Sequence, residues 1–374
     1  MKELLINPPF HLLMGQDQSY APLSLLWAAN IAEDPGIYNF EISEDLRPLS
    51  YSERFSGFEL YLSAVKNPDH LIWKNIRNVL EKYNPEEIWM THYYAKELSI
   101  KMIASLAEEM GINVRIKKPY EKPFSKNKIN ASRGRFECLL QKYEKNNLSH
   151  IFTSTGCPYK CGFCLSDVKV QFREISDIFS CDLFTFWDDA FTLSKKRIKE
   201  FADKKSKSKS SNIKYVCESR ADHLDEDNIK ILKESGCENI SVGFETGSER
   251  LLSLVRKGET LDDYYKAADF LNKHSIKWQA YAIIGFPTET REEIEETFSL
   301  MEKTKPGKII VSVYTPYPGT FLSRTFNRDK KDIFTMCHQA KNVNLTEMGD
   351  TEYEEVILDF LKRCDDYNDR REGN

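Results

Sequence analysis

The sequence has no run of about 18 apolar residues, and no apolar leader precedes its first strand-like run, which begins directly after Lys2. A membrane-spanning helix and a secretory signal are therefore not expected, and we predict a cytosolic protein without a membrane partner. An excess of charge of either sign is missing too, because 53 Lys and Arg residues are interspersed with 58 Asp and Glu residues, for a net charge of −5. This balance predicts no nucleic-acid partner.

The cysteines lack the regular pairing of a disulfide framework. There are nine, an odd number, and three of them occupy the stretch TSTGCPYKCGFC as Cys157, Cys161 and Cys164. Such crowding favours metal ligation in a reducing compartment over disulfide bonding.

A fourth cysteine ligand for this stretch is also missing. Structural zinc takes four ligands, commonly as two Cys-x-x-Cys pairs or as a Cys pair with a His pair, and no second pair occurs here. Cys138 lies in a helical pattern, Cys181 lies just before a strand-like run, and no four-cysteine ferredoxin spacing occurs. Zinc on three cysteines stays one interpretation. The other is an iron-sulfur cluster with one open iron, where a substrate or cofactor can bind.

Short apolar runs alternate with helical patterns over residues 1–118. They lie at 3–9, 22–34, 38–45, 71–83, 86–93, 97–111 and 112–118. This alternation predicts a Rossmann-like parallel sheet of four strands, covered by helices. Residues 119–149 are polar with one short helical pattern, which predicts a connector that ends near Ser149.

From His150 the alternation resumes in six larger units. Their apolar runs are HIFTST, LFTFWDD, IKYVCESRAD, ENISVGFETG, WQAYAIIGF and KIIVSVYTP. They predict a partial (β/α)6 barrel over residues 150–323, whose chemistry gathers at the carboxyl ends of the strands. Residues 324–374 are expected to form a mainly helical C-terminal extension, and the predicted fold class is α/β.

The cysteine stretch follows the first of these six runs. Cys157, Cys161 and Cys164 match the cluster motif of the radical S-adenosylmethionine (radical SAM) enzymes, with Phe163 at the aromatic position before the last cysteine. The resemblance implies a [4Fe-4S] cluster whose open iron chelates the amino and carboxylate groups of S-adenosylmethionine. An electron from the reduced cluster then cleaves the sulfonium bond and yields a 5′-deoxyadenosyl radical. In such enzymes the protein supplies position, water exclusion and substrate choice.

The residues that close the second and third runs resemble the same family, in its branch with an N-terminal cobalamin-binding domain. Asp188 and Asp189 close the second run, and the resemblance implies contact with the methionine amino group, since carboxylates accept hydrogen bonds from an ammonium. Helix capping is the alternative for Asp189. Glu218 and Arg220 close the third run, where a guanidinium fits the carboxylate of the cofactor; an interlobe salt bridge is the alternative.

The later strand ends continue the resemblance. Gly243 permits close approach after the fourth run, and Glu245 is expected to reach the cofactor at its ribose hydroxyls. The backbone around Ile284 and Gly285, after the fifth run, is expected to meet the adenine. The turn Pro318-Gly319-Thr320, after the sixth run, is similar to the same branch.

The segments LINPPF, APLSLLWAAN and EISED resemble the start of the cobalamin-binding domain of that branch, whose Rossmann-like sheet presents loops to the corrin. Three departures stand against a standard site. The Asp-x-His-x-x-Gly motif, with its histidine lower ligand, is missing, lysines in RIKKP replace a glycine pair, and the sheet ends one unit early. The first lobe is therefore expected either to hold cobalamin or to serve as a scaffold beside the barrel.

The sequence thus predicts a radical SAM enzyme that abstracts hydrogen from a small-molecule or peptide substrate. A cobalamin-dependent radical SAM C-methyltransferase and a non-catalytic zinc-binding protein are the alternatives. The expected partners are the substrate and an electron donor such as flavodoxin or ferredoxin. His92, Tyr314 and Tyr317 are candidates to line the active site, with packing roles as the alternative.

Overall fold

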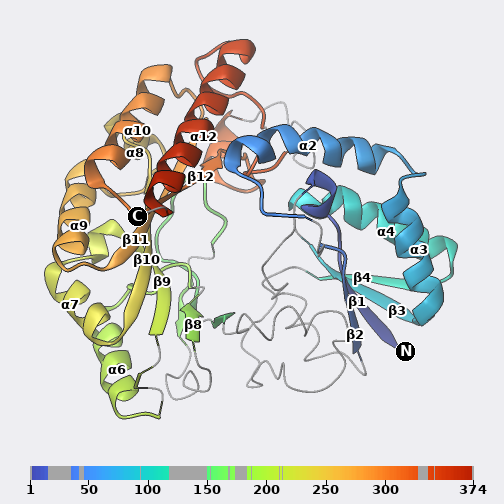
Figure 1. Ribbon diagram of the computed structural model, residues 1–374, viewed down its shortest axis with the longest axis horizontal. Coiled ribbons are helices and arrows are strands. Elements are labelled where there is room, and N and C mark those ends of the chain that lie inside the picture. Colours follow the sequence, from blue (N-terminus) through green and yellow to red (C-terminus); the bar gives the residue numbers. More distant parts are fainter. Residues whose placement is uncertain are drawn as a thin grey trace. The chain divides into compact units, whose positions relative to one another are not determined.

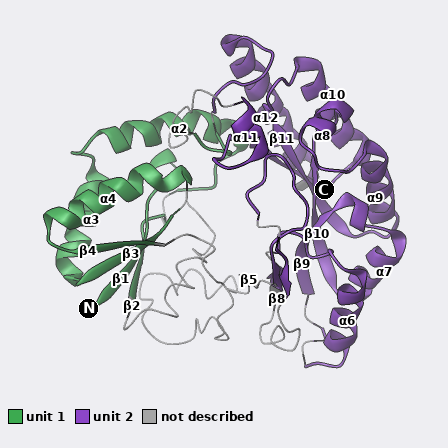
Figure 2. Ribbon diagram, turned by 180° about the vertical axis from the view of Figure 1, so that it is seen from behind, with its two compact units in different colours: residues 1–148, 332–341 green, residues 149–331, 342–374 purple. Residues whose placement is uncertain are grey.

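The computed structural model (Figure 1) describes residues 2–15, 35–41, 46–92, 94–117, 150–151, 153–166, 169–172, 183–186, 188–209, 211–212, 214–326, 336–340 and 342–372. The chain divides into two compact units, which are coloured in Figure 2. Unit 1 comprises residues 1–148 and 332–341, and unit 2 comprises residues 149–331 and 342–374. The expected helix at 22–34 and the expected connector at 119–149 lie outside the described residues.

The sheet of unit 1 is parallel, and its described strands have the order β2-β1-β3-β4. They are β1 (Glu3–Asn7), β2 (Pro35–Asn39), β3 (Glu87–Thr91) and β4 (Asn113–Lys117). β2 begins at Pro35 rather than at Tyr38, and an edge strand tolerates proline at its first position because its outward N–H needs no partner. The chain places β2 and β3 on opposite sides of β1. The crevice between β1 and β3 is therefore the topological switch point, where α/β sheets bind ligands.

Helices α2 (Tyr51–Lys66), α3 (Leu71–Tyr83) and α4 (Glu97–Glu109) accompany this sheet, with the 3-10 turns η1 (Leu12–Met14) and η2 (Tyr94–Lys96). The expected helical patterns at 71–83 and 97–111 correspond to α3 and α4. The apolar pattern did not predict α2, because its large side chains are spread around the helix and Leu60 is 60% exposed. The capping box formed by Ser50 and Glu53 is the local signal that marks its start.

Unit 2 contains a six-stranded parallel sheet with the order β12-β11-β10-β9-β8-β5. Its strands are β5 (His150–Ile151), β8 (Leu183–Phe186), β9 (Lys214–Arg220), β10 (Cys237–Glu245), β11 (Lys277–Ile284) and β12 (Lys308–Val313). Each strand pairs with the next strand of this sheet in the sequence, as in a barrel. Among the described strands, β5 and β12 are the two edges of this sheet and do not pair with each other, so the barrel is partial. A short antiparallel pair, β6 (Ser154–Thr155) and β7 (Gln171–Phe172), brackets the cysteine stretch.

Figures 1 and 2 show the helices α6, α7, α9 and α10 on one face of this sheet. The helices of unit 2 are α6 (Lys195–Ser206), α7 (Glu226–Glu234), α8 (Glu249–Leu254), α9 (Leu261–Lys273), α10 (Arg291–Thr304), α11 (Phe321–Phe326) and α12 (Asp350–Glu372), with the 3-10 turn η5 (Ala221–His223). Side chains cap the first five: Ser194, Asp225, Ser248, Thr260 and Thr290 each accept a backbone N–H of the first turn. These caps fix where each helix begins after a strand end.

The residues predicted to form the C-terminal extension are divided between the two units. Residues 332–341 belong to unit 1, where Cys337 and Ala340 join the core, whereas α12 packs in unit 2. Asn368 of α12 accepts the N–H of Ile309 in β12 (2.8 Å) and donates to its carbonyl oxygen (2.9 Å). Because β12 is an edge strand, this side chain satisfies backbone groups that the sheet leaves open.

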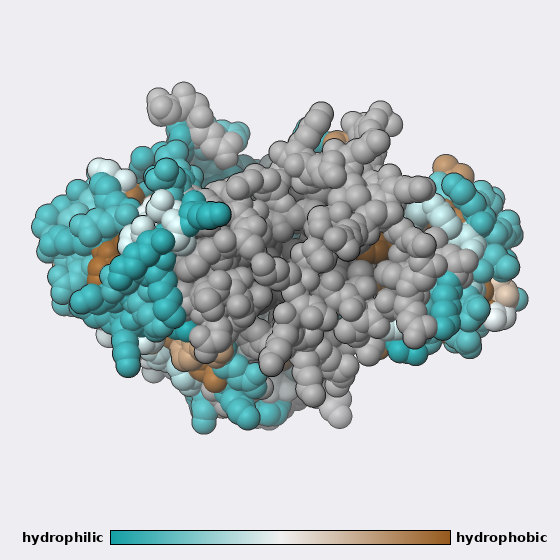
Figure 3. Space-filling model, turned by 90° about the horizontal axis from the view of Figure 1, so that it is seen from below, coloured by the Kyte–Doolittle hydropathy of each residue, from teal (hydrophilic) through white to brown (hydrophobic). Residues whose placement is uncertain are grey.

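The surface view in Figure 3 is mostly hydrophilic where it is coloured. The large apolar side chains that are exposed, among the described residues, are Leu60, Leu71, Ile116, Leu165, Phe172 and Tyr265. None of the helices in the described part of the chain is both long and apolar enough to cross a membrane.

Candidate active site at the carboxyl ends of the barrel strands

The three clustered cysteines lie on the loop between β6 and β7. Cys157 and Cys161 are half-buried, Cys164 is exposed, and all three are free thiols. Among the described residues, no three His, Cys, Asp or Glu side chains are arranged to hold a single metal ion. The donor set fits a [4Fe-4S] cluster, in which each thiolate binds a different iron.

Gly162 fixes the middle of this loop through its backbone. Its N–H donates to the carbonyl oxygen of Val255 (2.6 Å), and its own carbonyl oxygen accepts the N–H of Leu322 (2.9 Å). A Cβ at this position would lie 3.2 Å from side-chain atoms of Leu322 and Phe321 and 3.3 Å from the carbonyl oxygen of Val255. A side chain here would require these neighbours to shift by a few tenths of an ångström, so the close approach favours glycine.

Phe163 anchors the loop to the barrel by aromatic packing. Its ring centroid lies 5.9 Å from that of Phe286, which lies 5.5 Å from that of Tyr314. Tyr314 is 2% exposed and packs in this apolar cluster, and its role in lining the active site stays a prediction. Tyr317 is half-buried, and its carbonyl oxygen accepts the hydroxyl of Thr320 (2.8 Å) in the turn that follows β12.

Asp188 supports the strand that enters the cysteine loop. The residue is 1% exposed, and its Oδ1 accepts the backbone N–H of Thr153 (2.6 Å) and of Ser154 (3.0 Å). Its Oδ2 accepts both hydroxyls of the same two residues. Burial raises the pKa of this carboxyl, and the four hydrogen bonds oppose the rise.

Asp189 joins the two ends of the cysteine loop. Its Oδ2 accepts the N–H of Gly156 (2.8 Å), just before the first cysteine, and its Oδ1 accepts the hydroxyl of Ser166 (2.5 Å), just after the last. Capping of the next helix by Asp189, the alternative from the sequence, is wrong because Ser194 caps α6. Contact of Asp188 or Asp189 with a methionine amino group stays a prediction, and the engaged oxygens of Asp188 disfavour it for that residue.

Arg220 ties the end of β9 to the cysteine loop. Its Nε and Nη2 donate to the two carboxylate oxygens of Asp222 (2.9 and 3.0 Å), and Nη2 also donates to the carbonyl oxygen of Lys257 (3.0 Å). The guanidinium carbon lies 3.6 Å from the ring centre of Tyr159, which sits between two of the cysteines. The hydroxyl of Tyr159 is 2.7 Å from Nε2 of His223. The loop is therefore held to β9 and to η5 together.

Glu218 precedes Arg220 by two residues and is half-buried at the same strand end. Its Oε1 accepts the hydroxyl of Tyr281 (3.1 Å). Burial raises the pKa of Glu218 to about 7, the Tyr281 hydrogen bond opposes the rise, and nearby carboxylates add to it. A carboxyl group with such a pKa at a strand end is a candidate for proton transfer or for binding an ammonium.

Glu245 ends β10 in the left-handed backbone region, with a φ of 63°. Its Oε1 lies 2.7 Å from Nζ of Lys257, which is 4% exposed and lies 3.2 Å from Oε2 of Glu259. Burial alone would lower the pKa of Lys257, but Glu245 and Glu259 outweigh it and hold the pKa above its ordinary value.

Lys257 and Glu259 are site residues that sequence reasoning missed. They lie in the stretch RKGET after α8, where Arg256 and Gly258 both have positive φ (54° and 75°). Charged residues in such a stretch are ordinarily solvated. No spacing in the sequence distinguishes these two buried ones from exposed ones.

The turn after β11 carries the residues expected near adenine. Ile284 is fully buried, and Gly285 has a φ of 79°. The backbone N–H groups of Gly285 and Phe286 both donate to Oε2 of Glu289, which is buried beneath the turn. Oε1 of Glu289 and the hydroxyl of Tyr353 are buried without a hydrogen-bond partner among the described residues. Glu289, which the sequence did not indicate, therefore fixes the backbone of this strand end by accepting two of its N–H groups.

Replacement of Glu289 by glutamine is expected to remove a pH dependence of stability. Burial raises the pKa of Glu289 to about 8 from the 4.5 of an exposed carboxyl, so the folded chain holds an extra proton between these values. The free energy of unfolding of the wild type should then fall as pH rises through this window, by at most about 1.4 kcal/mol per pH unit. Glutamine mimics the protonated carboxyl, so the advantage of E289Q should grow toward pH 8. Thermal unfolding of both proteins from about pH 5 to pH 9 measures this, and parallel curves would contradict it.

The surroundings of the cysteine loop raise the pKa of two of its thiols. Burial raises the pKa of Cys161 to about 11, opposed by the cations Lys257 and Arg220. Burial likewise raises the pKa of Cys157, and the carboxylate of Asp189 adds to the rise. Thiolates at these positions therefore require a bound metal group to displace their protons.

A buried ion-pair network lies at the switch point of unit 1, the crevice between β1 and β3. Glu41, fully buried, lies 2.6 Å from Nζ of Lys96 and 3.2 Å from Nδ1 of His11. Burial alone would raise the pKa of Glu41, but its contacts with Lys96 and His11 hold the pKa well below its usual range. Lys96 also donates to Asn7 (2.9 Å). At the same edge, Nε2 of His92 lies 3.1 Å from Oε2 of Glu97.

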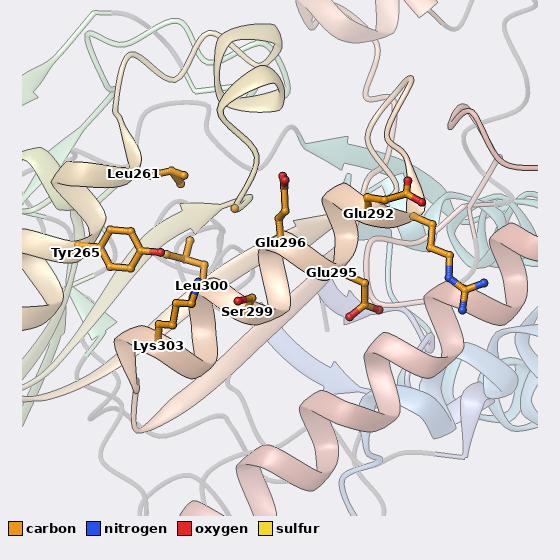
Figure 4. A pocket seen from close by; sticks show the side chains of 10 residues that line it. Leu261, Tyr265, Glu292, Glu295, Glu296, Ser299, Leu300 and Lys303 are labelled. Carbon is orange, nitrogen blue, oxygen red and sulfur yellow. The ribbon is translucent and has the colours of Figure 1, made fainter.

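A groove in unit 2 lies between α9 and α10, in the helical layer (Figure 4). Its lining includes Leu261 and Tyr265 from α9, and Glu292, Glu295, Glu296, Ser299 and Lys303 from α10. It contains none of the cysteines and none of the residues that end strands. We therefore assign it no part in the chemistry of the cysteine loop.

Comparison with known proteins gives a family for the part of the chain that carries the cysteine loop and the strand ends. Residues 151–301 match the model of the Radical SAM superfamily. The chain carries a radical SAM domain. The predicted family is confirmed, and such a domain implies a [4Fe-4S] cluster and S-adenosylmethionine as its cofactors.

Two curated relatives are methyltransferases. An uncharacterized methyltransferase of Pyrococcus horikoshii is 32% identical over 199 residues, which cover 49% of this chain and 43% of the relative. The bacteriochlorophyllide d C-12(1)-methyltransferase of Chlorobaculum tepidum is 25% identical over 229 residues, which cover 54% of this chain and 49% of the relative. The match thus spans less than half the length of either relative.

The fold also matches a solved radical S-adenosylmethionine methyltransferase, TsrM of Kitasatospora setae. The match covers 87% of this chain and 76% of that one, with a TM-score of 0.58 and 13% identity, so it shows the fold alone. A second structure of TsrM contains cobalamin and a [4Fe-4S] cluster. The predicted α/β class, a Rossmann-like sheet followed by a partial radical SAM barrel, is confirmed.

Proposed function

We propose that the chain is an enzyme that cleaves S-adenosylmethionine reductively and abstracts hydrogen from a small-molecule or peptide substrate. The observation that supports this most is the junction of the cysteine loop with the ends of β9 and β10. Arg220 contacts the loop residue Tyr159, and Lys257 connects Arg220 with Glu245. The cysteine donors for a cluster and the groups suited to its chelated cofactor are therefore connected by direct contacts.

The bound cofactors supply one-electron cleavage of a carbon–sulfur bond and the radical that removes hydrogen from the substrate. The chain supplies ligands and position. Cys157, Cys161 and Cys164 would hold the cluster as thiolates, and the two aspartates that follow β8 hold their loop in shape.

The remaining strand ends are proposed to hold S-adenosylmethionine. Arg220 has Nε and Nη2 engaged in the hydrogen bonds described above, so Nη1 is proposed to meet the cofactor carboxylate. Glu218 is proposed near the amino group, Glu245 at the ribose, and the backbone of Ile284 and Gly285 at the adenine. The partner that delivers the electron is proposed to be a flavodoxin or a ferredoxin.

The test is anaerobic reconstitution with iron and sulfide, followed by S-adenosylmethionine and dithionite. The expected results are roughly four irons per chain, an iron-sulfur absorption band, and 5′-deoxyadenosine with methionine as products. Iron binding without deoxyadenosine would overturn the proposed cleavage. Zinc in place of iron, with no cleavage, would favour the zinc-binding alternative.

A second candidate, a cobalamin-dependent radical SAM C-methyltransferase, is favoured by the parallel sheet of unit 1 and by the likeness to TsrM. Reconstitution with hydroxocobalamin and desalting separates the two candidates. About one corrin per chain would favour methyl transfer. An iron-sulfur spectrum without corrin would favour direct hydrogen abstraction and leave unit 1 as a scaffold, in keeping with the ion pairs that occupy its switch point.

A further inference from the structure

Lys257 is a buried cation for which the proposed chemistry has no direct use. It is 4% exposed, and it lies after α8 rather than at a strand end. Its Nζ is 2.7 Å from Glu245 and 3.2 Å from Glu259, two carboxylates that are themselves buried. Burying a charge this completely is costly unless it is paired, so the arrangement requires an explanation.

Lys257 is the ion-pair partner of Glu245. Among the described ion pairs, Glu245 has only Lys257, whereas Glu259 also has Arg220 at 3.8 Å. Without the lysine, Glu245 would be left in a buried site close to a second carboxylate. The contact that fixes its Oε1 would also be lost.

Gly243 provides the space for this ion pair. A Cβ on Gly243 would lie 2.4 Å from Oε1 of Glu245 and 2.8 Å from Nζ of Lys257. Both distances are shorter than van der Waals contact, so any side chain there would displace the pair. The glycine expected to permit approach of the cofactor therefore also accommodates the lysine.

We propose that Lys257 is a positioning residue for S-adenosylmethionine: it holds the Glu245 carboxylate in one orientation by binding Oε1, which leaves Oε2 to accept the ribose hydroxyls. This inference rests on the proposed function. It predicts that Lys257 affects cofactor binding only through Glu245. A lysine that merely supports the cysteine loop would act independently of Glu245.

A double-mutant cycle separates these roles. The dissociation constant of S-adenosylmethionine is measured by anaerobic equilibrium dialysis, without reductant, on reconstituted wild type, K257M, E245Q and the double variant. K257M and E245Q should each weaken binding by about tenfold to a hundredfold, the effect of a hydrogen bond to a charged group. The double variant should bind no more weakly than E245Q. Additive losses would overturn the proposal.

A shorter ligand gives a second readout. Methionine carries the amino and carboxylate groups but no ribose, so K257M should leave its binding to the reconstituted protein unchanged. Equal weakening of methionine and S-adenosylmethionine would overturn the proposal. The matched control is K266M, which removes an exposed lysine from α9 and should change neither affinity.

Gly243→Ala tests the same geometry without removing a charge. It should weaken S-adenosylmethionine binding and leave iron content unchanged, and unchanged affinity would count against the proposal. If K257M fails to take up iron, two other variants still test the proposal. They are G243A and the double variant, which has no carboxylate at position 245. Failure of the wild type itself to bind S-adenosylmethionine would instead reject the proposed function.

Discussion

Replacement of Cys161 by alanine is expected to abolish both cluster binding and cleavage of S-adenosylmethionine. The loop offers three thiolates, and Cys161 lies beside Gly162, whose backbone is fixed by Val255 and Leu322. Its sulfur is therefore held by the best anchored part of the loop. Two remaining thiolates cannot retain a cubane, so the iron content should fall from roughly four per chain to background, with no 5′-deoxyadenosine.

The measurement is iron and sulfide analysis of the reconstituted variant, with product analysis after dithionite. The matched control is C237A, which removes a buried cysteine from the start of β10 and should keep its iron. A C161A protein that still cleaved S-adenosylmethionine would show that the cluster is held elsewhere. Loss of iron in both variants would indicate a folding defect rather than the loss of a ligand.

The sequence predicted the parts of this protein that depend on local periodicity. Strands and helices have different spacings of apolar residues, so α3, α4 and the six-stranded sheet could be located from the amino-acid pattern alone. The cysteine spacing is equally local, and the family that it indicated is confirmed by the match over residues 151–301.

The parts that depend on tertiary packing could not be predicted. Asp188 and Asp189 are adjacent and chemically identical, and only the fold buries one and leaves the other exposed. The burial of Lys257 depends on an empty space at Gly243, fourteen positions away along the chain. The return of residues 332–341 to unit 1 has no signal in the local pattern either.

Replacement of Asp188 by alanine should be the most destabilising change at the strand ends. Alanine would leave the backbone N–H groups of Thr153 and Ser154 buried without an acceptor, together with two hydroxyls. A buried donor left without an acceptor costs about 1–3 kcal/mol, so the loss of the acceptor for two backbone N–H groups should cost about 2–6 kcal/mol. In a unit of this size that corresponds to a fall of roughly 10 °C in the midpoint of thermal unfolding.

We expect a different result for the neighbouring aspartate. The D189A variant should lose little stability but should retain less iron than the wild type. Asp189 is exposed and makes two hydrogen bonds, so its removal should cost about 1 kcal/mol, but those two bonds close the ends of the cysteine loop. D188N, which keeps one oxygen for the two backbone N–H groups, should fall between wild type and D188A in stability. Thermal unfolding of the metal-free proteins and iron retention after reconstitution measure the two effects separately. Equal stability of D188A and D189A would contradict the assignment of Asp188 to the buried support of the loop.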